Sequence, residues 1–197
     1  MSAETRIRTR PLLDEARLSL GESVHSATLI GSNVLVLDGR RSPRNKDIGL
    51  RTGMTAPAHS MAAGKLLLAA LDDSQIVALF PVEPFARRGP ETITTRQELF
   101  SELQAIRSQG WAESREESES GVHSVAIPLD GETWRTRMAL VMSLPRERAE
   151  KEALQDLAIA AITLVKQYSD QRTVSPWSFT SRSSTRSHTL SPTLKSR

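Results

Sequence analysis

The sequence predicts an α+β fold whose core is a mostly antiparallel β-sheet. Three observations carry this prediction. A helical segment near the start is followed by two β-rich runs joined by a short turn. Helical segments come next. A second pair of β-rich runs across a turn then leads into one long helix. Strands joined by short turns pair antiparallel, which sets the expected sheet type.

The first 40 residues contain the first helix and the first hairpin. Gly21 is expected to end a helix over 11–20, because three apolar residues share one helical face: Leu12, Ala16 and Leu20. Val24–Ile30 and Val34–Leu37 have strand composition, and 31–33 has the Gly, Ser and Asn chemistry of a hairpin loop. Residues 48–51 are expected to return to the sheet.

The middle of the chain predicts three helices. Residues 58–71 are rich in Ala, Leu and Met and contain no β-branched residue, which favours one continuous helix. Residues 72–74 offer an N-cap for a short helix over 75–80. Thr95 and Glu98 have the spacing of a capping box. The helix behind it has a buried stripe and closes at Gly110; the stripe is Leu99, Leu103 and Ile106.

The last third predicts strands over 122–129 and 135–144, joined by a turn at 130–131. A long helix is expected over 146–168, because its apolar residues recur every three or four positions. They are Leu154, Leu157, Ala161, Leu164, Val165 and Tyr168.

Composition indicates a soluble domain with a tail. The chain has 197 residues and no cysteine, which excludes a disulfide scaffold, a thiolate zinc site and a cysteine nucleophile. Its longest apolar run, 66–71, is far shorter than a membrane span. Residues 171–197 carry five basic residues and no acid, so the +3 of the whole chain leaves −2 for residues 1–170. We expect a cytoplasmic protein with a disordered tail, whose basic and aromatic residues could instead contact nucleic acid.

Motifs for chemistry are few. The four histidines lack metal-ligand spacing and are expected to be surface or half-buried imidazoles, and no phosphate-binding loop, dinucleotide fingerprint or nucleophile elbow occurs. No metal, no cofactor and no enzyme activity are therefore expected. One acidic segment leaves two interpretations open. It is either a solvated acidic turn or part of a small enzyme that uses two carboxylates as an acid/base pair. The carboxylates are Glu113, Glu116, Glu117 and Glu119.

Small residues cluster where the helix over 58–71 begins: Ser60, Ala62, Ala63 and Gly64. Small side chains there leave backbone N–H groups and the positive end of the helix dipole accessible to an anion. They would equally let the helix lie close against a sheet. Composition does not decide between these two interpretations.

From this helix onward the chain resembles the IclR-type bacterial transcriptional regulators in four ordered blocks: Gly53–Ala69, Thr92–Trp111, Glu116–Pro128 and Met138–Pro145. The resemblance covers residues 11–170 and implies the effector-binding domain of that family, with a GAF-like fold of helices around a curved sheet. It leaves residues 1–10 as an extension and 171–197 as the tail. It also implies a homodimer, often paired into a tetramer, and control of an attached winged helix-turn-helix domain on operator DNA.

Only ten residues precede the resemblance, so no DNA-binding domain is expected in this sequence, whether it is an excised piece or a natural stand-alone sensor. A stand-alone sensor could act instead as an interaction module that forms mixed oligomers with full-length regulators. The resemblance assigns effector contacts to Ala62, Ala63, Ser114, Ser124, Val141 and Ser143. Where small-acid binders have a second hydroxyl, this sequence has Val141, so we expect a more apolar aromatic or longer aliphatic acid.

Overall fold

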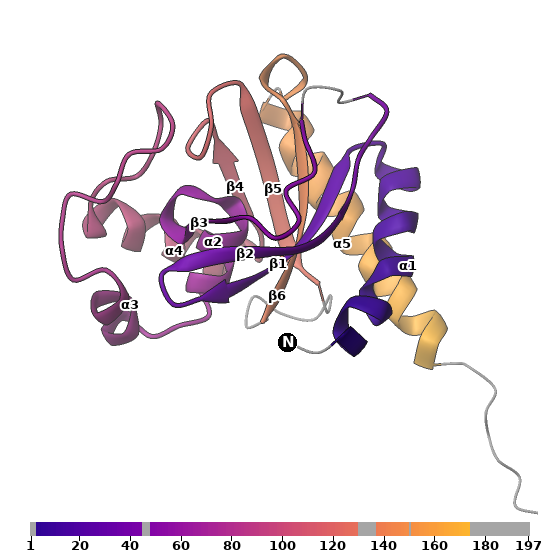
Figure 1. The fold of residues 1–197 in the computed structure, drawn as a ribbon, viewed down its shortest axis with the longest axis horizontal. Coiled ribbons are helices and arrows are strands. Elements are labelled where there is room, and N and C mark those ends of the chain that lie inside the picture. Colours follow the sequence, from indigo (N-terminus) through magenta and orange to yellow (C-terminus); the bar gives the residue numbers. More distant parts are fainter. Residues whose placement is uncertain (1–2, 45–47, 130–136, 150, 174–197) are drawn as a thin grey trace, which may run out of the picture.

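The computed structural model describes residues 3–44, 48–129, 137–149 and 151–173. Six strands form one sheet in the order β3-β2-β1-β6-β5-β4, and every neighbouring pair is antiparallel (Figure 1). The predicted α+β fold with an antiparallel sheet is therefore confirmed. The strands are β1 (Ser23–Ile30), β2 (Asn33–Arg40), β3 (Thr55–Pro57), β4 (Ala112–Arg115), β5 (Val122–Pro128) and β6 (Met138–Pro145).

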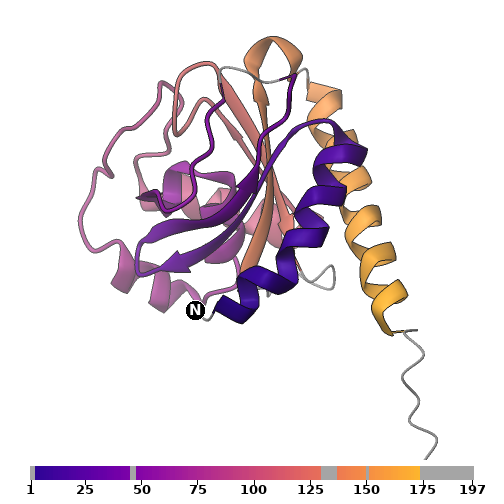
Figure 2. The same cartoon turned by 45° about the vertical axis from the view of Figure 1, so that its right-hand side comes forward.

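Helices cover both faces of this sheet. The long terminal helices α1 (Ala3–Leu20) and α5 (Lys151–Thr173) lie side by side on one face (Figures 1 and 2). The other face is covered by α2 (Ala62–Leu68), with α4 (Arg96–Gln109) packed behind α2. The short helix α3 (Asp73–Leu79) connects these two. The sheet is thus the middle of three layers.

Alternation along the strands divides the core in two. Successive side chains of a strand point to opposite faces. Leu140 and Met142 of β6 join the apolar cluster under α1 and α5, whereas Ala139 and Val141 join the cluster under α2. Strand β1 behaves in the same way, with Val24 on the α5 side and Ala27 on the α2 side. We call the side covered by α2 the inner face.

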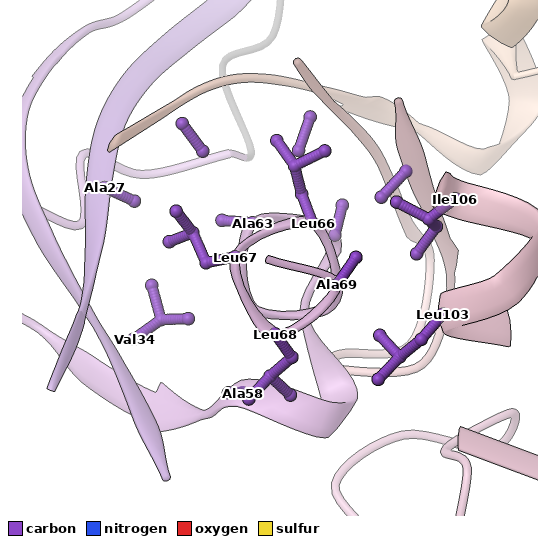
Figure 3. Close-up of a cluster of buried hydrophobic side chains, with 14 of the residues drawn as sticks. Ala27, Val34, Ala58, Ala63, Leu66, Leu67, Leu68, Ala69, Leu103 and Ile106 are labelled. Carbon is purple, nitrogen blue, oxygen red and sulfur yellow. The ribbon is translucent and has the colours of Figure 1, made fainter. Parts of the chain in front are cut away.

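The predicted continuous helix over 58–71 is wrong. A 3₁₀ turn (Ala58–Ser60) is followed by Met61 in an extended conformation, and α2 begins only at Ala62. Gly64 permits the break, since a Cβ at this position would lie 2.1 Å from the carbonyl oxygen of Ala58. The 3₁₀ turn therefore folds back onto the first turn of α2. Leu67 points from α2 toward the β1–β2 hairpin, and Ala69 points toward α4 (Figure 3).

Other elements were predicted correctly. The β1–β2 hairpin turns at Gly31, and Gly110 ends α4 in the left-handed conformation with φ 84°. The capping box before α4 is present, with Thr95 Oγ1 accepting from Glu98 N at 3.2 Å and Thr95 N donating to Glu98 Oε2 at 3.1 Å. The predicted N-cap within 72–74 is Asp72, whose amide donates to Gln75 Oε1 at 2.9 Å, but the helix behind it spans Asp73–Leu79 instead of 75–80.

Several boundaries need correction. Helix α1 begins at Ala3 instead of Pro11, and residues 48–51 do not form a strand. The third strand comes later, at β3. The final helix does not start at 146, because a 3₁₀ turn (Arg146–Arg148) precedes α5. Strand β4 was not predicted.

Two expectations fall on residues outside the described ranges, namely the turn at 130–131 and the tail beyond Thr173. The division of the chain at residues 11 and 170 stays a prediction. Within the described ranges, no helix is both long enough and apolar enough to cross a membrane.

Candidate functional site

A row of serines crosses the inner face of the sheet. The strand register pairs Ser114 of β4 with Ser124 of β5, Ser124 with Ser143 of β6, and Ser143 with Ser23 of β1. Ser124 Oγ and Ser143 Oγ lie 3.0 Å apart and share a hydrogen bond. Ser114 Oγ is buried and has no hydrogen-bond partner among the described residues. The antiparallel register thus gathers three predicted site residues into one polar row.

The other three predicted site residues lie on the same face in the apolar cluster beside this row. Val141 is two positions from Ser143 on β6 and packs in one cluster with Ala62 and Ala63 of α2. Both alanines are buried at the start of α2, where amides have no acceptor earlier in the same helix. The tight contact at Gly64 supports the close-packing interpretation of the small residues. Which of the six residues touch a ligand stays a prediction.

His25 of β1 completes this face, and sequence reasoning missed it. Its cross-strand neighbours are Val141 on β6 and Gly39 on β2. The residue is 3% exposed, and its Nε2 atom has no hydrogen-bond partner among the described residues. Burial, and secondly the charge of Arg51, lower the pKa of His25 from 6.5 to about 4. The imidazole is therefore neutral near pH 7. The available signal was its position two residues before Ala27, because residues two apart on a strand face the same side of the sheet.

The expectation of surface or half-buried histidines is wrong for three of the four. His25, His59 and His123 are all buried. His59 packs against the rings of Phe80 and Phe85, and its Nε2 lies 3.0 Å from the carbonyl oxygen of Ala86. Among the described residues, no group of three or more His, Cys, Asp and Glu side chains could hold a metal ion.

The acidic segment is a set of separate ion pairs. Glu113 pairs with Arg115 at 2.8 Å, Glu116 with Arg146 at 2.9 Å, Glu117 with Lys65 at 2.6 Å and Glu119 with Arg51 at 2.5 Å. Because each carboxylate has its own basic partner, the segment does not resemble an acid/base pair that shares one site. The reading of a solvated turn is also wrong for two of them, since Glu116 and Glu117 are buried.

Lys65 anchors α2 in this region. It is 1% exposed and its Nζ donates to Glu117 Oε1 at 2.6 Å and to Glu102 Oε1 at 2.7 Å. Burial raises the pKa of Glu117, although the positive charge of Lys65 opposes the shift. This contact links α2 to α4 and to the turn after β4.

A hollow lies outside the inner face, between α3 and α4. It is an open groove of about 860 Å³ whose lining includes Asp73, Val77, Arg96, Phe100, Gln104 and Arg107. None of the six predicted site residues lines it. It therefore serves as the competing location for a ligand.

The comparison with known proteins decides the family. Residues 1–170 match the family described as "Bacterial transcriptional regulator IclR C-terminal". The chain belongs to this family. IclR-family proteins are transcription regulators and not enzymes, which removes the alternative of a carboxylate-dependent enzyme.

The IclR-type chain is 36% identical over 134 residues to the Pca operon regulatory protein of Acinetobacter baylyi. The matched region covers 62% of this chain and 48% of that protein. The chain spans about half the length of the curated relatives it matches. The C-terminal domain of Escherichia coli KdgR has a similar structure, with a TM-score of 0.70 and 26% identity over 84% of this chain and 96% of that one.

A third comparison concerns the fold alone. The inducer-binding domain of PobR from Acinetobacter, solved as a double mutant with 3-hydroxybenzoic acid, superposes with a TM-score of 0.71. It is 22% identical and covers 82% of this chain and 95% of that one.

Proposed function

We propose that this IclR-type domain senses a small organic acid, which binds on the inner face between α2 and the serine row. The carrying observation is Ser114 Oγ, a buried hydroxyl without a protein partner among the described residues, at the end of a row of hydroxyls. A buried polar atom left without a hydrogen bond costs free energy, and a ligand that supplies the bond recovers it. The apolar cluster beside the row suits a hydrophobic ligand body.

Two features support an acid as the ligand. The PobR inducer-binding domain was solved with 3-hydroxybenzoic acid, a molecule with one carboxylate, one hydroxyl and an apolar ring. Hydroxyls from Ser114, Ser124 and Ser143 can meet polar groups of such a ligand, and the amides of Ala62 and Ala63 can meet a further polar group of it. Val141 makes the site more apolar than one with a second hydroxyl there, which favours an aromatic or longer aliphatic acid.

The proposed effect of the effector on DNA binding follows from its different affinities for different subunit arrangements. In the proposed mechanism the domain forms a homodimer or tetramer, and the effector favours one arrangement in proportion to how much more tightly that arrangement binds it. The arrangement would set how an attached winged helix-turn-helix domain holds operator DNA in the cytoplasm.

Thermal unfolding against a panel of acids tests this function. The panel contains benzoate, 3-hydroxybenzoate, hexanoate and pyruvate. An acid present at 100 times its dissociation constant stabilises the domain by about 2.7 kcal/mol. That corresponds to a rise in Tm of roughly 5–10 °C for a domain of this size.

Two serine variants locate the effect. Ser114→Ala should reduce the shift produced by the best acid, whereas Ser108→Ala should not, because Ser108 is an exposed residue of α4. Absence of any shift across the panel contradicts the proposed function. A shift that is equal in both variants contradicts the proposed place of binding.

A further inference from the structure

One ion pair connects opposite edges of the sheet. Arg51 lies in the segment between β2 and β3, and Glu119 lies in the turn between β4 and β5. These strands occupy the two ends of the sheet order, yet Arg51 Nη2 and Glu119 Oε2 are 2.5 Å apart. The segment that carries Arg51 passes in front of the sheet (Figure 1). The contact between Arg51 and Glu119 therefore joins two connecting segments from opposite edges of the sheet.

The backbone around Arg51 is held in place. Gly53 N donates to the carbonyl oxygen of Val36 at 2.8 Å, and Val36 N donates to the carbonyl oxygen of Met54 at 3.0 Å. Met54 N in turn donates to the carbonyl oxygen of Arg51 at 2.9 Å. Arg51 thus starts a turn that is fixed to β2, so its side chain extends from a backbone held by hydrogen bonds.

The two halves of this ion pair differ in exposure. The Arg51 side chain is 19% exposed, whereas that of Glu119 is 51% exposed. Little is lost when a half-exposed carboxylate returns to water, because an ion pair at the protein surface contributes little to stability. Lys65 offers the opposite case, since its ammonium is buried against two glutamates. Of these two cations, Arg51 is the one that can exchange its partner for the carboxylate of a ligand.

His25 links Arg51 to the inner face. The His25 ring and the segment that carries Arg51 both contact β2, because the ring packs against Gly39 and Gly53 N donates to the carbonyl oxygen of Val36. His25 Nε2 is buried without a partner among the described residues, and Val141 is its neighbour on β6. A neutral imidazole can make a hydrogen bond there without bringing a second charge into the site.

We propose that Arg51 and His25 form the acid-binding end of the effector site, where Arg51 releases Glu119 and takes the ligand carboxylate instead. Guanidinium and carboxylate match in a two-bond geometry, which makes this exchange selective for acids. Effector binding would then break the contact between the 48–54 segment and the β4–β5 turn. This assignment rests on the function proposed above.

Calorimetric titration of the whole chain with the acids of the panel, benzoate, 3-hydroxybenzoate, hexanoate and pyruvate, tests the assignment in two variants. Arg51→Gln removes the cation, and Glu119→Gln removes its competing partner. Both variants lose the same ion pair, so a purely structural role would affect them alike. We expect Arg51→Gln to weaken the affinity for the best acid about tenfold to a hundredfold, the range of a hydrogen bond to a charged group. We expect Glu119→Gln to bind that acid more tightly than the parent.

The amide of the best acid, for example 3-hydroxybenzamide for 3-hydroxybenzoate, is the neutral control. It should bind the parent and Arg51→Gln with equal affinity. An acid affinity in Arg51→Gln equal to that of the parent overturns the assignment and leaves the proposed function standing. So does a parallel loss of affinity in both variants. If no acid of the panel binds the parent, the proposed function and this assignment both fall.

Discussion

Lys65 Nζ lies 2.6 Å from Glu117 Oε1 in an almost fully buried ion pair. The contact joins α2 to the turn between β4 and β5, which contains Glu117. The backbone of Glu117 is held as well, since its carbonyl oxygen accepts from Thr92 Oγ1 at 2.6 Å and from Gly89 N at 3.0 Å. The helix that covers the inner face is therefore fixed to the far edge of the sheet by charge as well as by apolar packing.

Removal of one member of this pair should be costly. Lys65→Met leaves Glu117 buried without its cation, and such a loss costs about 3–5 kcal/mol of unfolding free energy. Urea denaturation measures the difference. The matched control is Arg115→Met, because Arg115 pairs with Glu113 in a part-exposed position and should lose only about 0–1 kcal/mol. Equal losses in the two variants would contradict the structural role of Lys65.

Gly64 should tolerate no side chain. The added methyl of Gly64→Ala meets the backbone of Ala58, which cannot rotate away, so we expect a loss of about 3 kcal/mol or more. Gly49→Ala is the control, since a Cβ there meets nothing within 4 Å, and it should change stability by less than about 0.5 kcal/mol. Thermal unfolding of both variants checks this. A stable Gly64→Ala protein would show that the 3₁₀ turn does not fold back as described.

His25 should make the domain acid-sensitive. Its pKa falls from 6.5 in the unfolded chain to about 4 in the folded one, so between these values the unfolded state binds the extra proton. The contribution of His25 to the free energy of unfolding is then fully present above pH 6.5 and is lost as the pH falls toward 4. We expect His25→Asn to lose roughly 2 kcal/mol less than the parent between pH 7 and pH 5. Urea midpoints at the two pH values measure this.

The comparison of the parent with His25→Asn also removes the contribution of the other buried histidines to the pH dependence of stability. The pKa values of His59 and His123 are also lowered, chiefly by burial, and both residues are present in parent and variant. Parallel loss of stability in the two proteins would show that His25 is not buried as a neutral imidazole.

Val141→Ser should change which acid binds. The substitution adds a hydroxyl two positions from Ser143, on the same face of β6. We expect tighter binding of short oxo- and hydroxy-acids such as pyruvate and lactate, and weaker binding of apolar acids, because a polar site rejects a ligand that leaves its hydroxyls unpaired. Calorimetry on parent and variant measures both. If the serine variant gains no affinity for the short acids, the assignment of Val141 to the site is wrong.

Local signals predicted the elements whose causes are local. The capping box at Thr95 and Glu98 and the hairpin turn at Gly31 depend on neighbouring residues, and both are present. The break at Met61 depends on how Gly64 meets Ala58 in space, which helix propensity does not report. Strand β4 was missed because its four residues include two charged side chains and its burial comes from pairing with β5.

The candidate site divides in the same way. The resemblance to known regulators pointed to Ser114, Ser124 and Ser143, but only the strand register shows that they form one row. The contact between Arg51 and Glu119 joins residues 68 positions apart, and no spacing along the chain indicates it. Pairings of this kind are decided by the curl of the sheet.

An amide chemical-shift titration by NMR locates the bound acid on the protein. Uniformly ¹⁵N-labelled protein is titrated with whichever acid of the panel raises Tm most. We expect the largest shift changes on the inner face, at Ala63, Ser114, Ser124, Val141 and Ser143. Largest changes at Val77, Phe100 and Arg107 would place the acid in the groove between α3 and α4, and would contradict an effector site on the inner face.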